Sequence, residues 1–202
     1  MNPSTLIPFL ARWMLSAVSI SLSLTTATAT AAPGPTDWLI DPTPYKARAT
    51  VGAGGRELEL NNGLIRRILR IQPNTATIAN DHLVPGESLF RGVKPEAVVE
   101  LDGRRYDIGG LRGQPNYAFL RPEWIDSLRA EPGAFQFIGY EFGKPVERLS
   151  WKRVRHHAPG VAWPPNGVTL RLDFAAPAST DGAATPDLRG AVHYELYHGI
   201  PA

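Results

Sequence analysis

Apolar and polar residues alternate along several short segments of this chain, which is the period of strands half buried in a sheet. In 168–174 the apolar positions predicted to point inward are Val168, Leu170, Leu172 and Phe174, and those predicted to point outward are Thr169, Arg171 and Asp173. The segment 57–60 alternates in the same way, and Asn61-Asn62-Gly63 after it predicts a tight turn. The pair Asp102-Gly103 likewise predicts a hairpin between 97–101 and 105–108.

Further strands are predicted by shorter or less regular apolar runs, at 64–71, 75–79, 135–142 and 192–197. The spacing in 64–71 also fits a helical turn, although its Ile and Leu content favours a strand. One short helix is predicted at 122–130, where Pro122 suits the first turn. Strands and helices do not alternate, which disfavours a parallel α/β sheet. The sequence therefore predicts an all-β fold, an antiparallel, supersandwich-like β-sandwich with at most one or two short helices.

The first part of the chain has the pattern of an export signal. In residues 1–32, Arg12 precedes an apolar stretch at 13–24, and small residues with two Ala-x-Ala patterns follow. Four serines interrupt the apolar stretch, which falls short of the roughly 20 residues that span a bilayer. We therefore expect a cleaved signal peptide, no stable membrane anchor, and an exported protein in the periplasm or outside the cell.

The rest of the chain divides into a lead-in and one domain. Four prolines in 33–48 indicate a linker or an irregular lead-in, and 49–202 is predicted to be the sandwich. The last predicted strand, 192–197, comes close to the end of the sequence. A strand placed there needs a partner for its open edge. We therefore expect the domain to be incomplete at its C-terminus.

Composition narrows the function classes. The chain has 43% hydrophobic and 20% charged residues, with 19 glycines and 19 prolines, which suits short strands joined by turns. The net charge of +2 is not concentrated in one block, so no nucleic-acid partner is predicted; the basic cluster at 152–157 fits a solvated strand face. The absence of cysteine excludes thiolate ligands and a cysteine nucleophile. His156 and His157 would point to opposite faces of a strand, so neither a metal site nor another cofactor is predicted.

Acid–base chemistry has two sets of candidate residues. Glu123, Asp126 and Glu131 lie near Trp124 and could serve sugar hydrolysis, although acidic residues also stabilise the first turn of a helix. His156 and His193 could act in a small sandwich enzyme such as a sugar epimerase. Motifs for a serine hydrolase, a P-loop or a dinucleotide site are missing from the sequence. No catalytic residue is therefore predicted from the residues alone.

Aromatic residues in loop-like contexts are the candidates for binding. Indole and phenol rings combine an apolar face with a polar edge, which suits stacking on sugar rings, although buried rings also fill sandwich cores. The candidate carbohydrate-binding residues are Trp124, Trp151, Trp163 and Tyr117. They support a free-standing carbohydrate-binding module as one hypothesis for the function.

Three strings in the sequence form an ordered set: Leu60-Asn61-Asn62-Gly63-Leu64-Ile65-Arg66-Arg67, Gly86-Glu87-Ser88-Leu89-Phe90-Arg91, and Val192-His193-Tyr194-Glu195-Leu196-Tyr197-His198-Gly199-Ile200-Pro201. In this order they resemble the N-terminal β-sandwich of the α-galactosidase (melibiase, glycoside hydrolase family 36) family. The resemblance covers about residues 57 to 201 and implies a supersandwich packed on a following (β/α)8 barrel. In that family the two catalytic aspartates belong to the barrel, and no position of this chain matches them. The resemblance implies a non-catalytic domain that supports the barrel and contributes to its sugar site.

Overall fold

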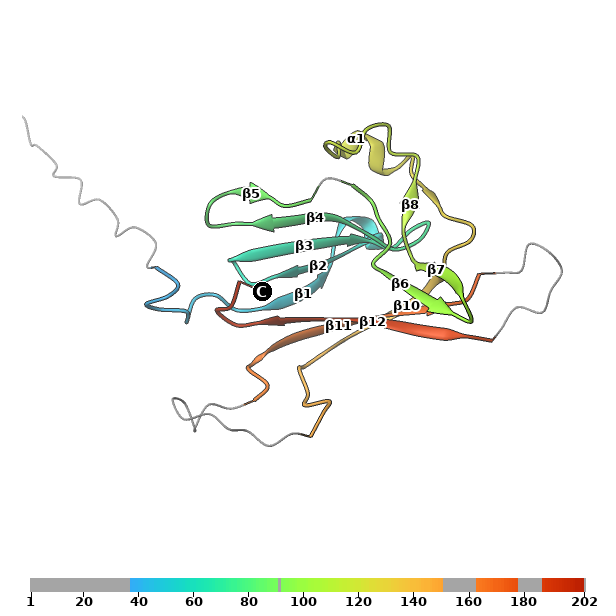
Figure 1. Cartoon of the computed structure of the whole chain (residues 1–202). Helices are drawn as coiled ribbons and strands as arrows, with labels where there is room; N and C mark the ends of the chain where they lie inside the picture. The colour runs from blue at the N-terminus through green and yellow to red at the C-terminus, as the bar shows by residue number, and fades with distance from the viewer. Residues whose placement is uncertain (1–36, 91, 151–162, 178–186, 202) are drawn as a thin grey trace, which may run out of the picture. The chain divides into compact units, whose positions relative to one another are not determined.

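The chain forms antiparallel β-sheets with one short helix (Figure 1). The computed structural model describes residues 37–90, 92–150, 163–177 and 187–201. Twelve strands and one α-helix lie in this part of the chain. The predicted signal peptide at 1–32, Trp151 and the basic cluster with His156 and His157 lie outside it. A search of the described ranges finds no helix that combines the length and the apolar character needed to cross a membrane.

The first sheet is a meander in which sequence neighbours pair. Its strands, in both spatial and sequence order, are β1 (Arg48–Val51), β2 (Glu57–Asn61), β3 (Ile65–Arg70), β4 (Ala76–His82) and β5 (Glu87–Ser88). A 3-10 turn, η1 (Ala53–Gly55), joins β1 to β2. The strand predicted at 57–60 is confirmed, because Leu58 and Leu60 are buried between less buried neighbours. The segment 64–71 forms a strand, and the helical alternative for it is wrong.

The second sheet contains three long strands, β10 (Gln136–Gly143), β11 (Gly167–Ala175) and β12 (Arg189–Tyr197), in that order. The alternation predicted for 168–174 is confirmed: Leu170, Leu172 and Phe174 are fully buried, whereas Arg171 between them is exposed. Among the described strands, β12 pairs only with β11 and so forms an edge of this sheet.

The two sheets lie as two layers, with the main hydrophobic core between them (Figure 1). Leu58, Leu60 and Leu69 come from the first sheet. Leu170, Leu172 and Phe174 come from the second. Burial of each such side chain contributes about 1.5–3 kcal/mol to folding. The predicted all-β antiparallel sandwich is therefore confirmed.

Two short hairpins and the helix complete the fold. In the first, β6 (Ala97–Leu101) pairs with β7 (Arg104–Ile108). Asp102 and Gly103 between them adopt φ values of 51° and 75°, as expected for a two-residue turn with positive φ at both positions. In the second, β8 (Leu111–Arg112) pairs with β9 (Arg129–Ala130).

The helix α1 (Pro122–Ile125) begins at the predicted proline but is shorter than the predicted range of 122–130. The hydroxyl of Ser127 donates a hydrogen bond of 2.7 Å to the carbonyl oxygen of Trp124 at the end of the helix. The chain then leaves to form β9. Pairing of that segment with β8 thus outweighs its local tendency to continue the helix.

Candidate functional site

Polar and charged side chains gather on the outward surface of the β10–β11–β12 sheet. Because side chains alternate along a strand, the residues between the buried Leu170, Leu172 and Phe174 face away from the core. The cross-strand pairs on this surface place Arg171 between Glu141 and His193. We call this surface the outer face, defined by Glu141 of β10, Thr169, Arg171 and Asp173 of β11, and His193 and Glu195 of β12.

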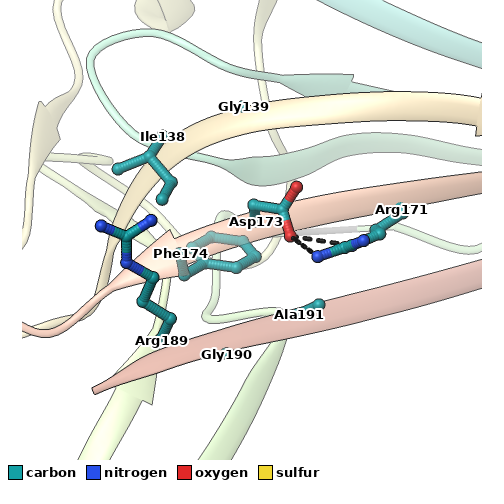
Figure 2. Close-up of a pocket in the computed structure, with 8 residues that line it drawn as sticks. All are labelled: Ile138, Gly139, Arg171, Asp173, Phe174, Arg189, Gly190 and Ala191. Atoms are coloured by element: carbon teal, nitrogen blue, oxygen red, sulfur yellow. Dashed lines mark hydrogen bonds and ion pairs between the residues drawn. The ribbon is translucent and has the colours of Figure 1, made fainter. Parts of the chain in front are cut away.

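One end of the outer face holds a hollow of about 370 Å³ (Figure 2). Its floor is made of small residues, Gly139, Gly190 and Ala191, so that the backbone is accessible there. Arg171 and Asp173 lie together at one side, with Arg171 Nε 2.8 Å from Asp173 Oδ1, and Arg189 lies near Ile138 at the other. Asp173 neutralises Arg171, so the positive charge that remains in the hollow is that of Arg189.

The other end of the outer face leads into a second hollow, of about 420 Å³, which we call the Trp163 groove. The groove is lined by Val146, Glu147, Arg148, Leu149, Trp163, Pro164 and Glu195. The apolar members are largely open to solvent: Leu149 is 78% exposed and Trp163 is 40% exposed. The predicted carbohydrate-binding residue Trp163 therefore lies in a hollow, with both apolar and charged neighbours.

The charged side of the Trp163 groove is a connected set of polar side chains. Arg148 Nη2 lies 3.3 Å from Glu195 Oε1 and 3.0 Å from His193 Nδ1. The Tyr197 hydroxyl donates a short hydrogen bond to the other oxygen of Glu195. This bond and partial burial raise the pKa of Tyr197 to about 12, so the phenol keeps its proton and remains a donor. Arg148 and Glu195 are thereby held beside the indole ring of Trp163.

His193 has a lowered pKa because of its partial burial and then because of the positive charge of Arg148. The folded protein therefore binds this proton less tightly than the unfolded chain does. It follows that the contribution of His193 to stability falls as the pH drops through the usual value of 6.5. Neutral His193 can accept a hydrogen bond from Arg148, whereas the protonated ring would repel it.

Replacing Arg148 by glutamine should raise the pKa of His193, because the nearest positive charge is removed while burial is little changed. A proton NMR titration of the His193 Cε1–H signal measures the shift. Arg189→Gln is the matched control, since Arg189 lies on the same strand but does not contact His193. An unchanged pKa in Arg148→Gln would show that Arg148 does not lie against His193 in solution.

Comparison with protein-family models, with curated proteins and with solved structures found no match to this chain. Within the described ranges, no group of three or more His, Asp or Glu side chains has the arrangement of a metal site.

The other predicted carbohydrate-binding residues do not join the Trp163 groove. Trp124 lies on α1, and Figure 1 places α1 on the opposite side of the sandwich from the loop that follows β10. There it stacks on Phe119 with a ring separation of 5.5 Å, and the guanidinium of Arg121 lies over both rings. Tyr117 is partly exposed and carries the Lys94 ammonium 4.1 Å from its ring centre. Cations thus already lie over these rings, and Trp151 lies outside the described residues.

The carboxylates near Trp124 bind arginines. Asp126 Oδ1 lies 3.2 Å from Arg56 Nη1 and 2.5 Å from the buried Arg70 Nη2, which ties the end of α1 to the first sheet. Glu123 lies 3.5 Å from Arg121 Nη1. These contacts give Asp126 a structural role in tying α1 to the first sheet, whereas the pair of Glu123 with Arg121 is exposed at the start of the helix.

Glu96 is the most buried carboxylate among the described ion pairs, with its side chain only 2% exposed. It accepts hydrogen bonds from the backbone N–H and the hydroxyl of Thr77 in β4 and from the hydroxyl of Tyr194 in β12. Burial and the charge of Glu96 strongly raise the pKa of Tyr194. Arg67 lies 4.0 Å from Glu96 and over the ring of Tyr194, so this network joins the two sheets through the core.

Sequence reasoning missed Arg148, Glu195 and Tyr197 as members of a site. Glu195 and Tyr197 did carry a signal, because they alternate with apolar residues in the predicted strand 192–197 and so had to share one face with His193. Arg148 carried none, since it follows the end of β10 in an irregular segment. Only the folded chain brings it against β12.

Proposed function

We propose that this chain is the non-catalytic N-terminal β-sandwich of a secreted α-galactosidase-like glycoside hydrolase, which supports a (β/α)8 barrel encoded after it. The observation that carries the proposal is that two of the three strings behind the resemblance meet in space. The side-chain amide of Asn62, from the first string, donates hydrogen bonds to the carbonyl oxygens of Tyr197 (2.9 Å) and Ile200 (2.7 Å), from the last.

Other contacts hold the last string at the same place. The backbone N–H of Ala47 donates to His198 Nδ1 at 2.9 Å, and the N–H of Gly199 donates to the Tyr45 carbonyl at 2.7 Å. Gly199 has a φ of 67°, and a Cβ there would lie 2.4 Å from the Cβ of Pro42, so only glycine fits. The first and last strings are therefore held together in the fold by specific hydrogen bonds, which explains why they occur together and supports the resemblance.

The arrangement of the carboxylates agrees with a supporting role. Hydrolysis of a glycosidic bond uses two carboxyl groups about 5–5.5 Å apart in retaining enzymes or about 6.5–9.5 Å apart in inverting ones, on either side of the bond. Here Asp126 and Glu123 bind arginines, and Glu96 is bound to Thr77 and Tyr194 in the core. We therefore assign bond cleavage to the proposed barrel and mechanical support to this sandwich.

The DNA that follows the codon for Ala202 tests the proposal. It should encode, in the same frame, a barrel with two catalytic aspartates. The longer product should hydrolyse 4-nitrophenyl α-D-galactopyranoside, and alanine in place of either barrel aspartate should abolish this activity. The 202-residue chain alone should show only the rate of the buffer. A reading frame without a barrel, or hydrolysis by the chain alone, would contradict the proposal.

A further inference from the structure

The Trp163 groove combines a solvent-exposed apolar wall with a fixed polar wall. Leu149 and Val146 are both more than half exposed, and the indole of Trp163 is exposed beside them. Large apolar side chains gathered in one hollow lose contact with water when a ligand with an apolar face covers them. The apolar wall therefore favours a ligand that is flat and carries C–H groups on one side.

The polar wall has unused hydrogen-bonding capacity. Among the described residues, Arg148 contacts Glu195 and His193 through Nη2, which leaves the donors on Nε and Nη1 for a ligand. Within the part of the chain that the structure describes, one oxygen of Glu195 contacts Arg148 and the other contacts Tyr197, so each can accept another hydrogen bond. Because these contacts fix both side chains beforehand, a ligand would not have to order them on binding.

We propose that the Trp163 groove binds a neutral hexopyranose unit, with one face of the sugar ring on the indole of Trp163 and its hydroxyls on Arg148 and Glu195. A pyranose has an apolar C–H face and a rim of hydroxyls that donate and accept, which matches the two walls. The volume of about 420 Å³ lies in the usual range for small-molecule sites, about 300–1,000 Å³.

Charge argues for a neutral sugar. The ionised residues of the groove are Arg148, Glu147 and Glu195, so negative charges outnumber positive ones. A phosphate, a sulfate or a sugar acid would be repelled by the two carboxylates. The proposal concerns the surface of this chain alone and does not depend on a barrel following it.

Titration of the 202-residue chain with neutral sugars tests the site. The probes are methyl α-D-galactopyranoside, melibiose, cellobiose, mannobiose and maltose, with binding measured by saturation-transfer NMR and by isothermal titration calorimetry. At least one probe should bind with a dissociation constant on the order of 1 mM, which is weak because the groove is open and the interface is small. Glucuronic acid should bind more weakly than the best neutral sugar.

Trp163→Ala should weaken the binding at least about tenfold, whereas Trp163→Tyr, which keeps a stacking ring, should restore most of it. Glu195→Gln should also weaken it, because its side chain no longer holds Arg148 by charge. Trp124→Ala is the matched control and should bind as the wild type does, since Trp124 lies on α1. Circular dichroism establishes that each variant is folded.

Several results would overturn the proposal. If none of the neutral sugars binds the wild-type chain, the groove is not a sugar site. Its exposed apolar wall would then favour a peptide segment as the ligand. If binding survives in Trp163→Ala and is lost in Trp124→Ala, the sugar binds at the aromatic cluster of α1. None of these results changes what the downstream DNA encodes, so this proposal and that of the supporting sandwich fail separately.

Discussion

Replacing Phe174 by alanine should lower the free energy of unfolding by about 3–5 kcal/mol, enough to unfold a marginally stable domain. Phe174 is 0% exposed and lies in β11, the central strand of the three-stranded sheet. Its ring packs edge-on against Phe137 of the neighbouring strand, with ring centres 6.1 Å apart. Alanine would lose this contact and leave a cavity between two sheets whose hydrogen-bonded strands cannot close over it.

Urea denaturation followed by circular dichroism measures the loss, as a lower midpoint with an unchanged slope. Phe119→Ala is the matched control, because the same atoms are removed from a ring that is 43% exposed and contacts Trp124 and the Arg121 guanidinium near the surface. The control should lose about 1 kcal/mol or less. Equal losses in the two variants would mean that Phe174 is not at the centre of the core.

The elements that could be predicted from the sequence are those encoded by neighbouring residues. The burial of Leu170, Leu172 and Phe174 follows from a period of two, and the β6–β7 hairpin follows from the tolerance of Asp102 and Gly103 for positive φ. Both signals act within a few residues and do not depend on what the rest of the chain does. The same locality explains why the prediction of 64–71 remained ambiguous, since its apolar spacing fits two periods.

The parts that could not be predicted depend on residues far apart in the sequence. The contact of Arg148 with Glu195 forms one wall of the Trp163 groove and joins an irregular segment to β12. No sequence pattern in either segment predicts that the two will be in contact. The hydrogen bonds that Thr77 and Tyr194 donate to Glu96 likewise join residues far apart in the sequence. The helix predicted at 122–130 was too long for a related reason, because its last two residues, Arg129 and Ala130, pair with β8. Tertiary pairing overrides local propensity at such places.

Asn62→Ala should lower the free energy of unfolding by at least about 3 kcal/mol, because Asn62 does more in the fold than form the predicted turn. The sequence predicts only a turn residue. In the structure Asn62 is 2% exposed, and its Oδ1 accepts hydrogen bonds from the N–H groups of Leu64 and Ile65, each at 3.0 Å. Its amide donates to the carbonyl oxygens of Tyr197 and Ile200, so alanine leaves four backbone groups without their side-chain partner. Each buried group left unsatisfied costs about 1–3 kcal/mol.

Asn61→Ala is the matched control, which separates the loss of the hydrogen bonds of Asn62 from a general effect of changing the turn. Asn61 is the neighbouring residue of the same type, but its side chain bonds to two groups of its own turn and strand, Glu59 (2.9 Å) and the N–H of Gly63 (2.8 Å). Replacing Asn61 by alanine should lower the free energy of unfolding by about 1 kcal/mol. Asn62→Asp keeps the acceptor and loses the donor, and its carboxylate would face two carbonyl oxygens, so it should destabilise the fold about as much as alanine does. If Asn62→Ala and Asn61→Ala lose the same stability under urea denaturation, Asn62 serves only the turn, and the contact between the two strings that supports the proposed family loses its weight.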